Sequence, residues 1–85
     1  MPKSAAPDAQ TIVADFLIEL RRARGVSQVE LARRMQTTQQ FVSKVETRER
    51  RLDLGQFHEL VRALGADPEA AAVEVFRRLR EASAS

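Results

Sequence analysis

The segment at residues 27–46, SQVELARRMQTTQQFVSKVE, constrains the fold of this chain more than any other. Ser27 followed three residues later by Glu30 has the spacing of a capping box, which predicts the start of a helix. Apolar residues then recur at the spacing of one helix face: Leu31, Ala32 and Met35. A turn follows and ends in a good N-cap, Thr38, so a second short helix is expected directly after the first.

The second helix of this pair has a polar outer face. Val42 and Val45 are its inward positions. Amide, hydroxyl and amine groups occupy its outer side, on Gln39, Gln40, Ser43 and Lys44. Phe41 lies near the edge, and the sequence leaves open whether it faces solvent or folds back onto the domain. Few folds hold a short polar-faced helix rigidly against another, and the helix-turn-helix DNA reader is the main one.

These residues resemble the lambda-repressor-like helix-turn-helix family, also called the Cro/repressor or xenobiotic-response-element type. The resemblance covers roughly residues 12–66, from a lead-in at 20–28 (LRRARGVSQ) to a closing run at 57–65 (FHELVRALG). It rests on about a dozen positions in one register, which makes it more specific than a lone short motif.

The sequence departs from the family at two turns. The position between the paired helices, usually glycine, is Gln36, and a positive φ there would cost on the order of 1 kcal/mol. The recognition helix, which in the family often ends in Asn-Gly or Arg-Gly, is here followed by Thr47 and Arg48. The sequence therefore does not decide the shape of the loop at 47–52, or whether the recognition helix continues for one more turn past Glu46.

The whole pattern predicts an all-α chain of five helices and no strand, built as a lambda-repressor-like domain. Besides the pair, helices are expected at about 9–24, 54–64 and 68–81. Asp53 and Gln56 form a second capping-box pattern, and Gly25 predicts a left-handed C-cap. The expected divisions are a disordered arm at 1–8, a DNA-binding domain at 9–66 and a C-terminal helix for packing or dimerisation at 67–82.

The charge of the chain is unevenly distributed. The net charge is +2, but residues 21–51 hold nine basic groups and three acids, a net +6, so the rest carries −4. A basic middle of this kind is typical of a surface that faces phosphates. Taken alone, it would more ordinarily be a solvated arginine-rich face, and the helix-turn-helix pattern favours DNA.

Composition excludes several function classes. The chain has no cysteine, a single histidine (His58) and no glycine-rich phosphate loop, so we expect no enzyme, no cofactor and no metal site. No apolar run approaches the roughly 18 residues of a membrane span, and the polar N-terminus has no signal region. These features predict a cytoplasmic protein, nucleoid-associated when bound to DNA.

The resemblance, together with the chemistry of the side chains, predicts a role for each site residue. Base readout falls to Gln39, Gln40, Ser43 and Lys44, and a glutamine amide suits adenine N6 and N7. Phosphate contacts fall to Gln28, Thr38, Arg48, Arg50 and Arg51, with Arg33 and Arg34 as further candidates. Arg21 and Glu46 align with a pair that forms an internal salt bridge between the first helix and the end of the recognition helix.

Two functions remain open at this point. The first is a sequence-specific regulator of transcription, a dimeric repressor that binds double-stranded DNA at a palindromic operator. The expected homodimer interface is a stripe on the last helix: Ala72, Val75, Phe76 and Leu79. The alternative for Phe76 is that its side chain packs into the bottom of its own domain and plugs the core there. The second function is an antitoxin-type or adaptor protein that binds a protein partner and also regulates its own promoter.

Overall fold

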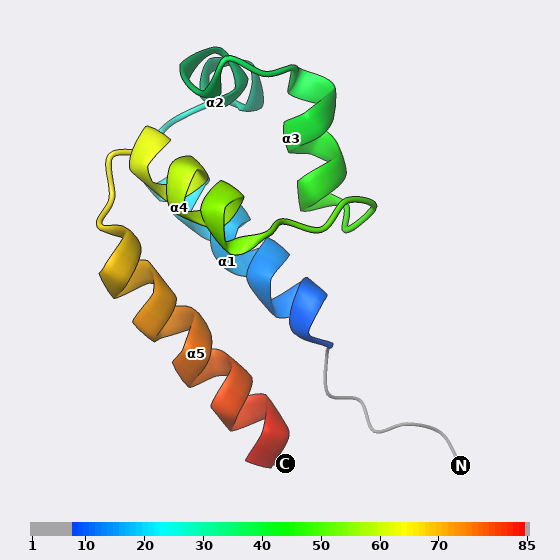
Figure 1. Cartoon of the computed structure of the whole chain (residues 1–85), viewed down its shortest axis with the longest axis vertical. Helices are drawn as coiled ribbons and strands as arrows, with labels where there is room; N and C mark the ends of the chain where they lie inside the picture. Colours follow the sequence, from blue (N-terminus) through cyan, green and yellow to red (C-terminus); the bar gives the residue numbers. More distant parts are fainter. Residues whose placement is uncertain (1–7, 85) are drawn as a thin grey trace.

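The structure, a computed structural model, describes residues 8–84 of the 85-residue chain. In that range it has five helices and no strand (Figure 1), which confirms the predicted fold class. The helices are α1 (Ala9–Ala23), α2 (Gln28–Met35), α3 (Gln39–Glu46), α4 (Leu54–Ala63) and α5 (Pro68–Ala84). None of these helices is both long and apolar enough to cross a bilayer. Residues 1–7 of the disordered arm expected at 1–8 lie outside the described part, and Asp8, its last residue, is the N-cap of α1.

Short polar side chains start the first four helices. The N-caps accept a hydrogen bond from the backbone N–H three residues on, and they are Asp8, Ser27, Thr38 and Asp53. Asp53 and Gln56 form the predicted reciprocal capping box. At Ser27 the box is only half formed, and that part of the prediction is wrong. The Glu30 carboxylate accepts from Arg33 and Arg34 instead.

Each of the four connections between the helices contains one residue in the left-handed region, and in the fourth it is Gly65 with a φ of 80°. Gly25 has a φ of 68°, as expected of a glycine after a helix. Gln36 has a φ of 58° and Arg48 a φ of 69°, so both positions where the family prefers glycine are strained here. Helix α3 ends at Glu46, so the alternative in which it continues for another turn is wrong. The chain turns back at Arg48, and the N–H groups of residues 49 and 50 both donate to the Lys44 carbonyl, at 2.9 and 3.1 Å.

All five helices contribute to one apolar core. Its largest fully buried side chains are Leu17, Leu31, Leu60, Leu64, Val42 and Val61. Val75 of α5, only 4% exposed, belongs to this core, so its assignment to a dimer interface is wrong. The helical spacing that put Val75 on one stripe with Phe76 could not show which flank of α5 the other helices cover. Helix α5 also runs three residues past the expected end, to Ala84.

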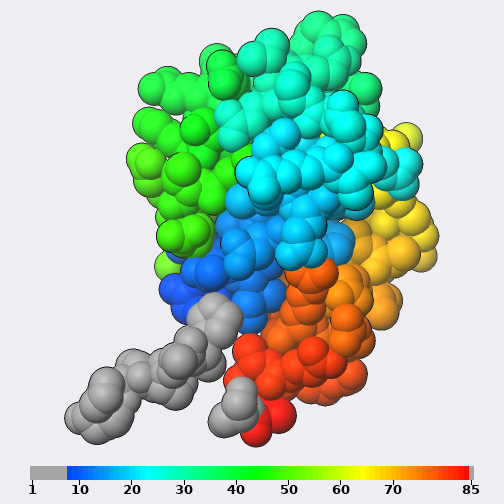
Figure 2. All heavy atoms as spheres, turned by 180° about the vertical axis from the view of Figure 1, so that it is seen from behind, coloured from blue at the N-terminus to red at the C-terminus, as the bar shows by residue number. Residues whose placement is uncertain are grey.

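The packing separates two surfaces. Helices α2 and α3 cap one end of the molecule, and α5 runs along α1 and α4 toward the other end (Figure 1). Seen from behind, the green surface of α3 and its loop lies far from the red C-terminal half of α5 (Figure 2). The polar α3 face and the outer face of α5 are therefore two separate surfaces of the molecule (Figure 1 and Figure 2).

Candidate nucleic-acid interface

Helix α3 presents its polar face outward. Gln39, Gln40 and Lys44 are exposed and Ser43 is partly exposed, while Val42 and Val45 are buried in the core. Since α3 has only eight residues, it is too short to be stable alone and depends on packing against its neighbours. The two valines fix its rotation, and this rotation brings the four polar side chains to one outer surface.

A partly buried ion pair connects the end of α3 to α1, at the two residues that the resemblance singled out. Arg21 donates to Glu46 from Nε to Oε2 at 2.6 Å and from Nη2 to Oε1 at 3.1 Å. The side chains are only 12% and 9% exposed. The third guanidinium nitrogen donates to the Val26 carbonyl at 2.9 Å. Because such a pair must repay the desolvation of two charges, its main effect is to fix the orientation of α3.

Gln28, at the first position of α2, extends this pair to the outer surface. Its Nε2 donates to Glu46 Oε1 at 2.8 Å, and its Oε1 accepts from Gln39 Nε2 at 3.3 Å. A continuous chain of contacts therefore runs from Arg21 through Glu46 and Gln28 to Gln39. The sequence assigned Gln28 to a phosphate, and here one N–H of its amide remains for such a contact.

Thr38 caps α3 and stays exposed. Its Oγ1 accepts from the Phe41 N–H at 3.1 Å, so the hydroxyl proton is still available to an acceptor from outside. This places a donor at the N-terminus of α3, where the helix dipole favours an anion.

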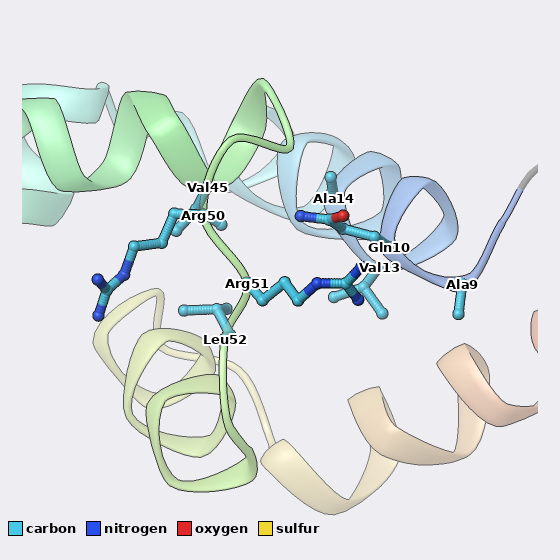
Figure 3. A pocket seen from close by; sticks show the side chains of 8 residues that line it. All are labelled: Ala9, Gln10, Val13, Ala14, Val45, Arg50, Arg51 and Leu52. Atoms are coloured by element: carbon cyan, nitrogen blue, oxygen red, sulfur yellow. The ribbon is translucent and has the colours of Figure 1, made fainter.

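The three arginines of the loop after α3 are exposed, and two of them, Arg50 and Arg51, point in different directions (Figure 3). Arg50 lies over the Phe41 ring, with its guanidinium carbon 5.1 Å from the ring centroid. Arg51 extends the opposite way, toward α1 and the side chains of Gln10 and Val13 (Figure 3). Arg51 and Arg48 also help to lower the pKa of Asp8, although the hydrogen bonds from Thr11 are the main cause.

Two contacts at this surface had no signal in the sequence. Gln10 Nε2 donates to the Arg48 carbonyl at 2.8 Å and so ties α1 to the loop across 38 positions. Arg34 Nη1 donates to the Ala63 carbonyl at 2.9 Å, besides pairing with Glu30. Since Arg33 also pairs with Glu30, these two arginines are less available for phosphates than their position suggested.

The outer face of α5 is apolar and only partly covered. Phe76 is 64% exposed, so the interpretation that it plugs its own domain is wrong. Ala72 and Leu79 are partly buried beside it, and Leu54 at the start of α4 is also exposed. Together with Leu52 and Phe57 these side chains line a shallow apolar groove between α4 and α5. Among the residues described, no group of histidine, aspartate and glutamate could hold a metal ion.

The fold and the polar face of α3 define a DNA-binding regulator of the helix-turn-helix class. The family model "Helix-turn-helix domain" matches residues 12–73. An XRE-family like protein from Pseudomonas syringae pv. tomato is 40% identical, with a TM-score of 0.77 over 81% of this chain and 84% of that one. The chain therefore belongs to the lambda-repressor-like, XRE-type helix-turn-helix family.

Two more distant structures share the fold. The restriction-modification controller protein C.Esp1396I is 15% identical, with a TM-score of 0.77 over 86% of this chain and 94% of its own. The clp gene regulator ClgR from C. glutamicum is 22% identical, with a TM-score of 0.73 over 81% and 90%. No curated protein sequence matches the chain.

Proposed function

We propose that the protein represses transcription by binding, as a homodimer, to a palindromic operator. One observation carries the proposal: the exposed polar face of α3 is connected through Gln28 to the partly buried Arg21–Glu46 pair. A reading surface must hold its side chains in a fixed geometry before the base edges meet them, and this network supplies that geometry.

The proposed readers are Gln39, Gln40, Ser43 and Lys44. Gln40 and Lys44 lie one helical turn apart on the outside of α3, and both are exposed. A glutamine amide can form two hydrogen bonds with adenine, because its N–H donates to N7 and its oxygen accepts from the N6 amino group. A lysine suits guanine O6 or a phosphate.

The proposed phosphate contacts surround this face. Gln28 and Thr38 offer donors at the N-termini of α2 and α3. Arg48, Arg50 and Arg51 add charge from the loop at the other end of α3. Because phosphates are the same in every sequence, these contacts would give affinity without specificity.

The proposed dimer interface is the outer face of α5. It comprises Ala72, Phe76 and Leu79, with Leu54 of α4 at its edge. An exposed phenylalanine beside an apolar groove is self-complementary across a two-fold axis, since each copy offers both the side chain and the groove. Such a dimer would place two α3 helices about 34–36 Å apart, one turn of DNA.

The same apolar face supports a second candidate, an antitoxin-type or adaptor protein. A partner other than a second copy could cover Phe76 and Leu54. A small toxin-like open reading frame next to the gene, whose product co-purifies with this chain, would favour this candidate.

Genomic pull-down followed by footprinting tests the proposed function. We expect a footprint with two half-sites, and a reporter driven from that site whose expression rises when the gene is deleted. Binding should weaken with salt, with a log–log slope of about −0.9 per neutralised phosphate. An affinity that is the same at low and physiological salt, or a reporter that falls silent on deletion, would contradict the proposal.

A further inference from the structure

Arg50 lies against the recognition helix although it follows that helix in the sequence. The N–H groups of residues 49 and 50 donate to the Lys44 carbonyl. These two hydrogen bonds hold the start of the loop against the last turn of α3. The Thr47 hydroxyl donates to Glu49 Oε2 at 2.9 Å and closes the turn further. From this anchored backbone the Arg50 side chain reaches the Phe41 ring, which belongs to the first turn of α3.

Helical geometry shows where this contact lies on α3. At about 100° per residue, Phe41 stands roughly 60° from Lys44 and roughly 160° from Gln39. Phe41 therefore forms the flank of the outer face next to Lys44, and Gln39, bonded to Gln28, forms the other flank. Arg50 widens the outer face of α3 beyond Lys44, on the side away from Gln28.

The stack also fixes how the guanidinium can act. Phe41 is half-buried and packs against the core, so its ring is a firm support. A guanidinium over an aromatic face is attracted to it and keeps its N–H donors at its edge. Those donors can bind two oxygens of one phosphate in a fork-like arrangement. Arg51, which turns toward α1, has no such support from α3 (Figure 3).

We propose that Phe41 positions Arg50 to bind a DNA phosphate on the Lys44 flank of α3, an inference that rests on the proposed function. Phe41 is in this account a positioning residue and does not read a thymine methyl, because Arg50 covers its ring. Arg50 is thereby distinguished from Arg48 and Arg51, which add charge without an aromatic support.

A double-mutant cycle on the footprinted duplex tests this coupling. We expect Phe41→Leu, which keeps an apolar side chain in the core, to weaken binding roughly two- to fivefold. Arg50→Ala should weaken binding at least as much, and the double variant should bind like Arg50→Ala alone. Phe41→Tyr should retain the wild-type affinity. Arg51→Ala is the matched control, and its effect should multiply with that of Phe41→Leu.

Two further readouts separate the possible outcomes. In the free protein, the δ-methylene protons of Arg50 should show an upfield NMR shift from the Phe41 ring, lost in Phe41→Leu while circular dichroism stays unchanged. If Phe41→Leu has the same effect with and without Arg50, or none at all, the inference is overturned while the proposed function stands. If the wild-type protein binds no specific duplex, the proposed function itself has failed.

Discussion

Arginine–carboxylate pairs stabilise both ends of this molecule, but in opposite surroundings. At the α3 end, the side chains of Arg21 and Glu46 are only 12% and 9% exposed, and each makes further hydrogen bonds. On α5, Arg77 and Arg78 share Glu74, and Arg78 also reaches Glu19, with most of these groups substantially exposed. Water and salt screen the second set, so it adds little stability. In the Arg21–Glu46 pair, loss of one residue leaves the charge of the other without its partner, away from solvent.

The outer surfaces of these two regions also differ, because the surface of α3 is polar and that of α5 is partly apolar. Helix α3 buries apolar side chains and shows amides and an amine to solvent. Helix α5 buries Val75 but also exposes Phe76 and Val73. The region with the rigid internal network therefore has the surface suited to polar base edges. The region fastened by surface ion pairs has the surface suited to an apolar partner.

The largest difference between the two regions should appear on removing one arginine from each. Arg21→Ala leaves the partly buried Glu46 carboxylate without its charged partner, a loss of stability that can reach about 3–5 kcal/mol where burial is complete. Arg77→Ala should change stability little, as should Arg62→Ala on α4. Urea unfolding of the three variants measures this. Equal losses for Arg21→Ala and Arg62→Ala would show that the Arg21–Glu46 pair is absent or exposed in solution.

Phe76→Glu tests the surface of α5. Because Phe76 is 64% exposed, the variant should fold normally, and a charge in the proposed interface should make it monomeric at micromolar concentration. Binding should then be limited to a single half-site and become weak. Sedimentation and circular dichroism together measure these effects, with His58→Glu on α4 as the control for added charge. A variant that stays dimeric would show that Phe76 is not in the interface, and one that unfolds would contradict the exposed position of its side chain.

The two strained turns around α3 should yield smaller, stabilising changes. Gln36→Gly and Arg48→Gly each remove a side chain from a left-handed conformation, and each should raise stability by about 0.5–1 kcal/mol. Arg48→Gly should also weaken DNA binding through the lost charge, whereas Gln36→Gly should not. Gly25→Ala, with a φ of 68°, is the control and should be destabilising. If Arg48→Gly is less stable than the wild type, the Arg48 side chain makes a contact that stabilises the fold by more than the backbone strain destabilises it.

The smallest effect concerns pH and the surface ion pairs. Hydrogen bonds from Arg77 and Arg78 lower the pKa of Glu74 to about 2, below its ordinary 4.5. A carboxyl whose pKa is lower in the folded state stabilises the fold above its unfolded pKa and loses that contribution as pH falls. The contribution of Glu74 should therefore fade between about pH 4.5 and 2. Stability curves of wild type and Glu74→Gln should converge over that window, and a constant gap down to pH 2 would contradict this.

Local features of the fold were predictable from the sequence because they depend on neighbours in the chain. The Asp53–Gln56 box and the glycine turn at Gly25 each require only residues within one turn. The prediction at Glu30 failed for a local reason as well, since Arg33 and Arg34 compete for its carboxylate. Here the ion pairs with the two arginines are stronger than the hydrogen bond that the Glu30 carboxylate would otherwise accept from the Ser27 backbone N–H.

Contacts between distant segments were beyond sequence reasoning except where the resemblance supplied them. Nothing in the sequence joins Gln10 to Arg48, or orients Arg50 toward Phe41 and Arg51 toward α1. Val75 and Phe76 are neighbours in the sequence, yet one is in the core and the other in solvent. Only the packing of α5 against α1 and α4 decides which flank is covered.

The central claim, that α3 reads bases while its surroundings bind phosphates, has one direct measurement. The affinities of wild type, Gln40→Ala and Arg51→Ala are compared on the footprinted site and on random duplex DNA. We expect Gln40→Ala to lose roughly 1–3 kcal/mol on the site and little on random DNA, and Arg51→Ala to weaken both by similar factors. If the two variants lose affinity in the same way on both duplexes, the polar face of α3 does not read sequence.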